Sequence, residues 1–379
     1  MNKRICDLEW GLALSGGGFR ATLFNLGGLW RLNELGLLKR LDIISSVSGG
    51  SITAGVLGLA WRDLQFDDHG VATNYFKRVV APLQSFCRLH VDVGSAIGGL
   101  ISLFSSIGDH VARKYAAKLF HDATLQDLPD ETLPKDDPNH GPRFNFYATS
   151  LQTGSSVRMC RKRLADYKLG EIPNPRVPLA KVVAASSAFP PALSPVVLKL
   201  RADDWKKLDG AYCYGIQALR EKLYLTDGGV YDNMGLETIW DRCKTVLVSD
   251  AGAPFTVKAS PPTGWLKQTL RVLGIITEQT RALRRRRLVD DFAHRAGAYW
   301  GIQTRIAGYA ASPVLAKDNS LTAGLAKIRT RLNPFSDEEQ GRLINWGYAL
   351  ADAAIRTYVI EDAPIGVLPM AGFSLDTNP

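Results

Sequence analysis

The stretch 41–61, "LDIISSVSGGSITAGVLGLAW", places Ser48 between a predicted strand and a predicted helix. β-prone residues lead into Ser48, two glycines follow it, and a run of small and apolar residues comes next. Such a turn holds the serine hydroxyl clear of its own backbone, at the N-terminus of the helix. The simpler alternative is that Ser48 only caps the helix. The other motifs of the chain are needed to decide.

A second strand–turn–helix pattern precedes this one. "GLALS" is a short apolar run, "GGGFR" a turn, and "ATLFNLGGLWRLNELG" has apolar residues at helical spacing up to Gly36. Two such units in succession predict an α/β fold, with a mostly parallel sheet flanked by helices.

The later elements are less regular. We expect paired strands at 143–150 and 155–163, a helix that starts at Pro178 and is stopped by Pro190-Pro191, further strands at 222–229 and 245–252, and a mostly helical final third.

Composition indicates a globular protein that carries reduced thiols. The chain has 379 residues, is 46% hydrophobic and has a formal charge of +9. Its five scattered cysteines form no CxxC pair, which favours the cytosol and argues against zinc. Acidic residues and glycines near the N-terminus argue against a secretory signal.

The basic charge is most concentrated at Arg281 and Arg284–Arg287. Four consecutive arginines point around most of a helix and form no single recognition face. A solvated helix is one interpretation of this run. Contact with anionic lipid or with an acidic partner is the other.

The apolar segment 93–108, "VGSAIGGLISLFSSIG", is too short to span a bilayer. As a helix it reaches roughly 24 Å, against a hydrocarbon core of about 30 Å. We expect either a buried core segment or a lipid-facing flap that uses Leu100, Leu103 and Phe104.

"SGGGFR" (15–20) is suited to stabilising an oxyanion. Gly16, Gly17 and Gly18 leave backbone N–H groups open to an approaching carbonyl, and Arg20 adds positive charge. Dinucleotide binding fits less well, because Ala21 stands where the last glycine is expected. A Walker loop is excluded, since no GK[ST] follows.

The general base is the harder assignment, because the chain has only six histidines. A triad of Ser48, Asp250 and His294 is conceivable. An aspartate acting directly as base is the alternative, and Asp209 and Asp227 both precede glycine in a D-G-[G/A] pattern. Asp227 is the better candidate because it ends an apolar strand, whereas Asp209 follows charged residues.

Four blocks in this order resemble the patatin-like phospholipases: "LALSGGGFRATLFNLGGLWRL", "ISSVSGGSITAG", "AASSAFPPALSP" and "LTDGGVYDNMG". The resemblance covers roughly residues 8–255, and a bacterial-type C-terminal part is matched more loosely. It implies a Ser–Asp dyad of Ser48 and Asp227, with Gly16, Gly17, Gly18 and Arg20 at the oxyanion loop. The chain departs from the family pattern at Ser46 and Ala21, where glycine is usual.

The resemblance therefore implies a serine lipid acyl hydrolase of the phospholipase A or lysophospholipase type. We expect a catalytic domain at 8–255 and a mainly helical C-terminal region at 256–379 packed on it. No metal or cofactor is expected. The expected partner is a membrane lipid or lysolipid, with peripheral contact to an anionic membrane, a cytoplasmic location and no nucleic acid.

Two other functions remain open at this point. A catalytically idle lipid-binding or scaffold protein would keep the fold without the reaction. A soluble esterase or thioesterase would use the same residues on another substrate.

Overall fold

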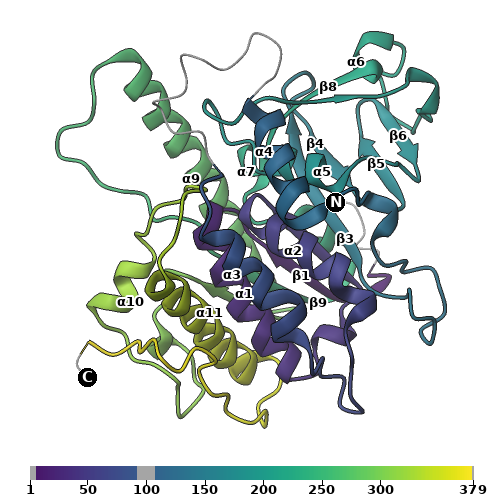
Figure 1. Ribbon diagram of the computed structural model, residues 1–379. Helices are drawn as coiled ribbons and strands as arrows, with labels where there is room; N and C mark the ends of the chain where they lie inside the picture. Colours follow the sequence, from purple (N-terminus) through teal and green to yellow (C-terminus); the bar gives the residue numbers. More distant parts are fainter. Residues whose placement is uncertain (1–5, 92–106, 378–379) are drawn as a thin grey trace.

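The computed structural model describes residues 6–91 and 107–377 and is built around one mixed sheet (Figure 1). The strands are β1 (Leu8–Leu14), β2 (Ile43–Val47), β3 (Arg143–Ser150), β4 (Ser156–Met159), β5 (Arg163–Asp166), β6 (Gly170–Pro173), β7 (Val196–Lys199), β8 (Lys222–Asp227), β9 (Cys243–Asp250) and β10 (Ala296–Gly301). The helices are α1 (Gly18–Glu34), α2 (Gly49–Ala60), α3 (Ala81–Cys87), α4 (Ile107–Tyr115), α5 (Leu179–Ser186), α6 (Gln217–Glu221), α7 (Gly229–Asp232), α8 (Glu237–Trp240), α9 (Trp265–Asp291), α10 (Ser320–Leu325) and α11 (Asp337–Tyr358).

The sheet has a parallel part and an antiparallel part. Strands β10, β9, β1, β2 and β3 lie side by side and run parallel. Strands β4, β5 and β6 continue the sheet from β3 in antiparallel order, and β8 and β7 also join it antiparallel. The predicted α/β fold is confirmed, and β1 and β2, the strands of the two strand–turn–helix units, lie in the parallel part of the sheet.

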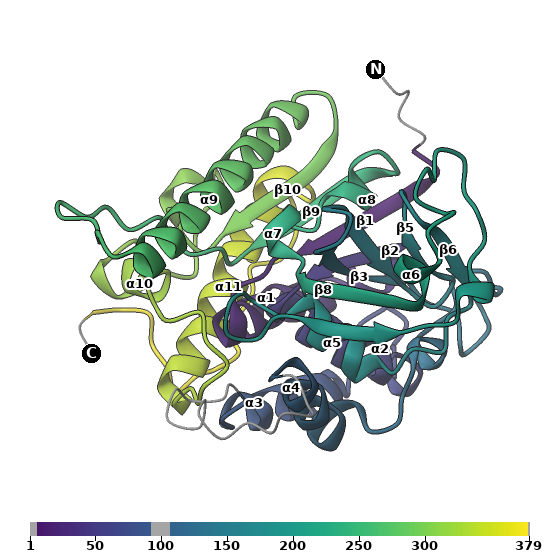
Figure 2. The same cartoon turned by 90° about the horizontal axis from the view of Figure 1, so that it is seen from above.

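Helices cover both faces of the parallel strands, as Figure 2 shows. Successive side chains of a strand point to opposite faces, so Leu12 and Leu14 pack with the larger core cluster while Ala13 packs with a smaller one. The larger cluster includes α1, α2, α5 and α11. The smaller cluster includes α8 and Leu288 of α9.

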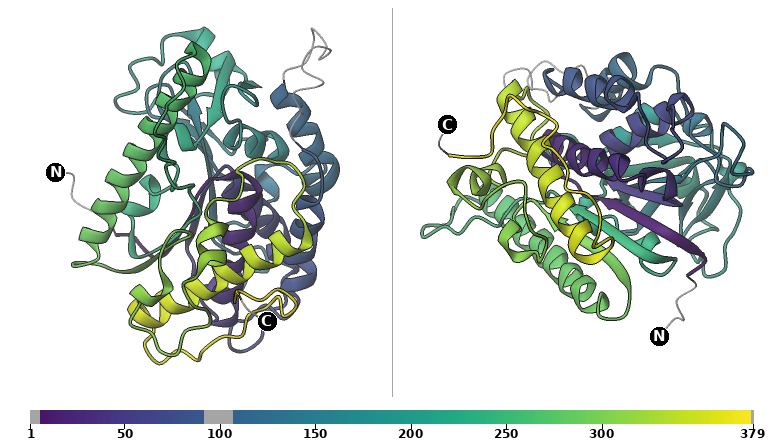
Figure 3. Two further views of the ribbon diagram at one scale, coloured as in Figure 1. Left: turned by 90° about the vertical axis from the view of Figure 1, so that its left-hand side faces the viewer. Right: turned by 90° about the horizontal axis from the view of Figure 1, so that it is seen from below.

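Helix α1 is buried on almost every side, because α11 lies along it, beside it on the sheet, and also packs against β10 (Figure 3). A Cβ at Gly27 of α1 would lie 2.0 Å from the Ile344 carbonyl oxygen. A Cβ at Gly347 of α11 would lie 2.0 Å from the Phe24 carbonyl oxygen. The two backbones therefore approach each other through glycines.

The region after residue 255 is mainly helical, as expected, but it also contributes β10, which the sequence pattern did not predict. Strand β10 pairs with β9 at the edge of the sheet. Its sequence "AGAYWG" has no clear alternation, and Gly297 is needed because a Cβ there would lie 2.2 Å from the Val246 carbonyl oxygen. A close backbone approach of this kind leaves no hydrophobic pattern in the sequence.

Part of the arginine run anchors α9 to the body of the protein. Arg284 lies 3.6 Å from the Asp232 carboxylate, and the Arg287 guanidinium lies 4.9 Å from the centre of the Trp240 ring. The interpretation as a solvated helix is therefore wrong for Arg284, which is half-buried where α7 packs against α9, whereas Arg287 stays exposed.

None of the helices in residues 6–91 and 107–377 combines the length and the apolar character needed to cross a bilayer. The segment 93–108 falls almost wholly outside the described residues. The two alternatives for that segment, a buried core segment or a lipid-facing flap, therefore stay predictions.

Candidate active site

Strand β3 brings Ser48 and Asp227 together. Along one edge of β3, β2 runs parallel and ends with Val47 opposite Tyr147. On the same edge, β8 runs antiparallel and ends with Asp227 opposite Ala148, the next residue. The carboxyl ends of β2 and β8 therefore point toward each other. Ser48, which directly follows β2, and Asp227, which ends β8, lie where the two strands meet.

Ser48 occupies a strained turn between β2 and α2. Its φ of 52° and ψ of −119° are unusual for a residue that carries a Cβ. The two glycines after it let the start of α2 approach the glycine loop and the end of β1. A Cβ at Gly49 would lie 2.1 Å from the Gly18 carbonyl oxygen, and a Cβ at Gly50 would lie 2.4 Å from the Leu14 carbonyl oxygen. Although Ser48 precedes α2, its side chain makes no capping hydrogen bond. The capping alternative is therefore wrong.

The C-terminal end of α5 and the residues just after it contact both candidate residues. The Ser48 N–H donates to the Ser186 hydroxyl at 3.0 Å, and the Gly228 N–H donates to the Ser186 carbonyl oxygen at 3.2 Å. The Asp227 N–H donates to the Ala188 carbonyl oxygen at 3.0 Å. One short stretch thus fixes the backbone at both residues. Helix α5 ends at Ser186, ahead of the two prolines that were expected to stop it.

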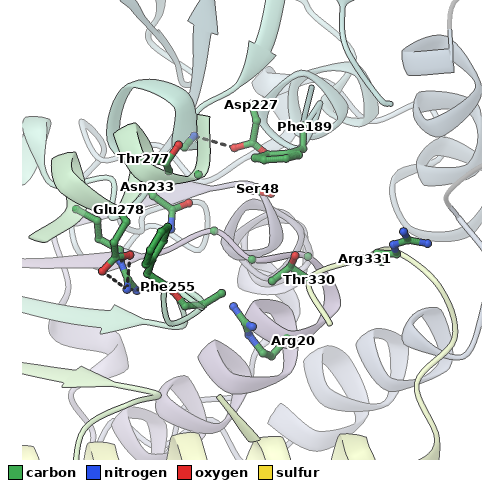
Figure 4. Close-up of a pocket in the computed structure, with 18 of the residues that line it drawn as sticks. Arg20, Ser48, Phe189, Asp227, Asn233, Phe255, Thr277, Glu278, Thr330 and Arg331 are labelled. Atoms are coloured by element: carbon green, nitrogen blue, oxygen red, sulfur yellow. Dashed lines mark hydrogen bonds and ion pairs between the residues drawn. The ribbon is translucent and has the colours of Figure 1, made fainter. Parts of the chain in front are cut away.

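The Asp227 carboxyl group is buried and is held by the turn that follows it. The Gly229 N–H donates to Oδ1 at 2.7 Å, which is the dashed line at Asp227 in Figure 4. Burial raises the pKa of Asp227 to about 6, while hydrogen bonds from the Gly229 N–H and the Ser48 hydroxyl act in the opposite direction. A carboxyl group with this pKa is ionised near neutral pH and is a stronger base than an ordinary aspartate.

The glycine loop lies beside Ser48, and its three glycines differ in role. The Gly16 N–H donates to the Asn233 carbonyl oxygen at 3.0 Å, so this N–H is not free to donate to an oxyanion. Gly17 and Gly18 have positive φ values of 141° and 58° and lead into α1. A Cβ at Gly18 would lie 2.3 Å from the Thr330 carbonyl oxygen. The N-terminus of α1 therefore opens next to Ser48, where a developing negative charge would be stabilised.

Arg20 is buried, and its guanidinium bonds to backbone carbonyls. It donates to the carbonyl oxygens of Ala251 at 2.6 Å, Ile328 at 2.8 Å and Ala326 at 3.1 Å. Burial, together with the nearby charge of Arg281, lowers the pKa of Arg20 to about 10. The side chain ties α1 to two distant loops and also contributes positive charge to the wall of the cavity.

Ser48 and Asp227 open into a cavity of about 800 Å³ (Figure 4). Its walls come from the glycine loop, the segment after α5, the loop 252–258, helix α9 and the loop 330–332. The apolar part of the lining includes Phe189, Ala192, Leu193, Phe255, Leu270 and Leu332.

Several residues of this site were missed in the sequence. Asn233 lies just after α7, and its side chain fits between two glycines that flank the site. A Cβ at Gly16 would lie 2.5 Å from Asn233 Oδ1, and a Cβ at Gly229 would lie 2.6 Å from it. Asp232, by contrast, has a structural role, because its carboxylate accepts from the Leu236 N–H at 2.8 Å at the start of α8.

The alternative base Asp209 lies away from the cavity. It is exposed, in a turn that includes Gly210 with a φ of 81°. The expectation of an exposed turn is confirmed for Asp209.

The alternative triad is not assembled. His294 is exposed and precedes β10, so it lies at the amino end of a strand parallel to β2, whereas Ser48 follows the carboxyl end of β2. Asp250 accepts from the Tyr299 hydroxyl at 2.9 Å and lies 3.6 Å from Arg281. In the described part of the chain, no histidine lines the cavity. The same residues contain no group of three or more His, Cys, Asp or Glu side chains that could hold a metal ion.

Two solved structures are similar to this one at low sequence identity. A human group IVD cytosolic phospholipase A2 structure is similar with 12% identity and a TM-score of 0.48, and the match covers 90% of this chain and 60% of that one. The structure of VipD from Legionella pneumophila is similar with 14% identity and a TM-score of 0.37, covering 91% of this chain and 66% of that one. This chain thus spans about 60% of the length of the human protein. No protein with a curated description matches the sequence.

The family comparison covers more than half of the chain. The model of the patatin-like phospholipases matches residues 12–240, which include the glycine loop, Ser48, the segment after α5 and Asp227. The chain belongs to the patatin-like phospholipase family.

Proposed function

We propose that this protein is a serine lipid acyl hydrolase of the phospholipase A or lysophospholipase type, which uses a Ser48–Asp227 dyad. Membership of the family supports lipid hydrolysis. The observation that carries the assignment of residues is the meeting of β2 and β8 on one edge of β3, at the cavity.

In the first half-reaction, Ser48 Oγ attacks the carbonyl carbon of the lipid ester, and the Asp227 carboxylate takes the hydroxyl proton. The carbonyl oxygen becomes an oxyanion that the N–H groups of Gly17 and Gly18 stabilise, with the α1 N-terminus behind them. The ester C–O bond then breaks, and Asp227 returns the proton to the departing alcohol oxygen. An acyl-Ser48 ester remains.

In the second half-reaction, water attacks the acyl-Ser48 ester while Asp227 takes one of its protons. Collapse of the intermediate releases the carboxylic acid, and the proton returns from Asp227 to Ser48 Oγ. Each proton that Asp227 takes is given back, so the enzyme is restored. In this proposal Arg20 acts on the oxyanion only through fixed charge, because its donors bond to carbonyl oxygens.

The cavity supports a lipid as substrate. It is large enough for an acyl chain, and Phe189, Phe255 and Leu270 are among the apolar side chains that line it. The proposal includes peripheral contact with a membrane, since a soluble chain acting on membrane lipids has to meet their surface.

The test combines a fluorophosphonate probe with a lipid panel. The wild-type protein should be labelled at Ser48 and should hydrolyse at least one phospholipid or lysophospholipid. We expect Ser48→Ala and Asp227→Asn each to lose activity by roughly a thousandfold or more. Circular dichroism would verify that both variants keep the fold.

His294→Ala and Asp209→Asn are the matched controls, and both should stay within a few fold of wild type. An inactive but folded His294→Ala would revive the triad. A wild-type protein that neither reacts with the probe nor hydrolyses any lipid would favour the idle lipid-binding alternative instead.

A further inference from the structure

Three serine hydroxyls form a continuous hydrogen-bonded chain behind Ser48. The Ser48 N–H donates to Ser186 Oγ at 3.0 Å, and Ser186 Oγ lies 2.8 Å from Ser51 Oγ. Ser51 Oγ donates to Ser46 Oγ at 3.0 Å, and Ser46 Oγ donates to the Asn145 carbonyl oxygen at 3.2 Å. Ser186, Ser51 and Ser46 form the serine chain, which runs from α5 through α2 and β2 to β3.

The direction of every hydrogen bond in the serine chain is fixed. A serine hydroxyl has one proton to donate. Because Ser51 donates its proton to Ser46, the Ser186 hydroxyl has to donate to Ser51. The Ser186 oxygen in turn accepts from the Ser48 N–H. All the donors therefore point away from Ser48 and toward the Asn145 carbonyl, and hydrogen bonds aligned in this way strengthen one another.

The serine chain is buried along its whole length. Ser46, Ser51 and Ser186 each have an exposed fraction of 0%. Bulk water therefore does not reach a hydroxyl that has lost its partner, and an unpaired buried hydroxyl is unfavourable. Because each hydroxyl is both donor and acceptor, removal of one should disturb the bonds on either side of it.

The serine chain ends where the two residues of the proposed dyad meet. Ser186 accepts from the Ser48 N–H through its hydroxyl and from the Gly228 N–H, at 3.2 Å, through its carbonyl oxygen. Gly228 directly follows Asp227. Ser48 has a φ of 52°, and a backbone strained in this way persists only when surrounding bonds hold it. The serine chain thus connects the turn of the nucleophile, and the backbone next to the base, to strand β3.

Ser46 is a residue at which the chain departs from the family pattern, where glycine is usual. A glycine has no hydroxyl, so it would leave the Ser51 proton without this acceptor and the Asn145 carbonyl without this donor. The preceding residue, Ser45, points to the other face of β2 and donates to the Gly235 carbonyl oxygen. The departure at Ser46 therefore completes the serine chain on the side of the sheet.

We propose that Ser46, Ser51 and Ser186 are positioning residues, which hold the Ser48 hydroxyl in line with Asp227 for proton transfer. This inference rests on the proposed function, because it concerns the attack of Ser48 in that reaction. The three side chains lie outside the lining of the cavity, so they act through the Ser48 backbone and not on the substrate. The rate of attack should depend on an intact serine chain, whereas substrate binding should not.

The test replaces Ser51, the middle link, by alanine. Alanine is the residue most favourable in a helix, so Ser51→Ala should keep α2 and the fold. We expect the maximal rate of fluorophosphonate labelling, and the kcat for a p-nitrophenyl fatty-acid ester, each to fall by roughly tenfold. The KM of the ester should stay unchanged, because the cavity is intact.

Ser45→Ala is the matched control for Ser46→Ala. Ser45 is the neighbouring residue of β2, is equally buried and also donates to a backbone carbonyl. The two variants should therefore lower the melting temperature alike, whereas only Ser46→Ala should lose kcat. Wild-type kcat in both Ser46→Ala and Ser51→Ala, or an equal loss of kcat in Ser45→Ala, would overturn the proposal.

A double-mutant cycle tests whether the serines act as one chain. Ser51 lies between Ser46 and Ser186 and bonds to both. If the chain acts as a unit, its first break already releases Ser48, so Ser46→Ala and Ser186→Ala combined should lose little more kcat than either alone. Independent effects would multiply to a loss of roughly a hundredfold, and that result would contradict the proposal.

The failure of this inference differs from the failure of the proposed function. A wild-type protein that reacts with neither the probe nor any ester removes the proposed function, and this inference with it. A wild-type protein that reacts, while the variants of the serine chain react equally fast, removes the positioning role alone.

Discussion

Asp227 is a buried carboxyl group that has to be charged in order to act as a base. Its folded pKa of about 6 is above the usual value of 3.8 for an aspartate, because burial disfavours the charged form. Hydrogen bonds from the Gly229 N–H and the Ser48 hydroxyl favour the charged carboxylate and limit the rise in its pKa. The residue that the proposed reaction needs is therefore one that the folded protein holds at a cost in stability.

We predict that hydrolysis rises as pH increases through about 6 and then levels off, because only ionised Asp227 accepts a proton. The stability of the fold should move in the opposite direction. A raised folded pKa contributes stability that is present below pH 4 and is lost as pH rises through about 6.

Asp227→Asn removes this titration. At pH 8 the inactive variant should be more stable than wild type by roughly 2–3 kcal/mol, and the difference should disappear near pH 4. Urea unfolding at several pH values would measure it. A variant that is less stable than wild type at pH 8 would contradict the pKa argument.

At the scale of single residues, the sequence reveals a chemical group best when its local pattern is unusual. Ser48 and Asp227 each end an apolar strand in front of two glycines, and the structure has both at strand ends beside the cavity. Ser186 and Asn233 carry no such pattern. Ser186 matters because its partner Ser48 lies 138 residues away in the sequence, and Asn233 matters because its side chain lies between the neighbouring Gly229 and the distant Gly16.

At the scale of elements, the contact between α1 and α11 holds the glycine loop in place. Helix α1 begins at Gly18, so any shift of α1 moves the N–H groups proposed to bind the oxyanion. Gly27 and Gly347 let the two helices approach, and each faces a backbone carbonyl of the other helix. Backbone atoms cannot move aside as a flexible side chain can.

We therefore predict that Gly27→Ala and Gly347→Ala each lower the free energy of unfolding by about 1–3 kcal/mol or more, through overpacking. Gly324→Ala in α10 is the control, because nothing lies within 4 Å of its would-be Cβ. It should be neutral or stabilising by up to about 1 kcal/mol. If denaturant unfolding showed all three variants to be alike, the close approach of α1 and α11 would be refuted.

The sequence predicts elements well where periodicity is strong and poorly where pairing is remote. The strands before and after the glycine turns and the long helix α11 follow from local pattern. The end-to-end meeting of β2 and β8 does not, because it depends on which edge of β3 each strand joins. Strand β10 was missed for the same reason, since its fit beside β9 depends on a close approach at Gly297.

At the scale of the whole molecule, the C-terminal region contributes to the core as well as to the cavity. The family match ends at residue 240, yet β9 and β10 extend the sheet beyond it. Two of the carbonyl partners of Arg20 belong to Ala326 and Ile328, and the Phe19 N–H donates to the Arg331 carbonyl oxygen. Removing these partners would leave a buried guanidinium and a helix N-terminus without their bonds.

We predict that a chain of residues 1–255 does not fold alone, although it contains Ser48, Asp227 and the glycine loop. It lacks β10 and α11, so one edge of β9 and one side of α1 would be exposed. Circular dichroism should show no cooperative unfolding, and the fluorophosphonate probe should not label it. Co-expression with residues 256–379 should restore both signals, because the break falls in the exposed loop before α9. A 1–255 chain that unfolds cooperatively and reacts with the probe would instead make the C-terminal region a separate addition to a self-sufficient catalytic domain.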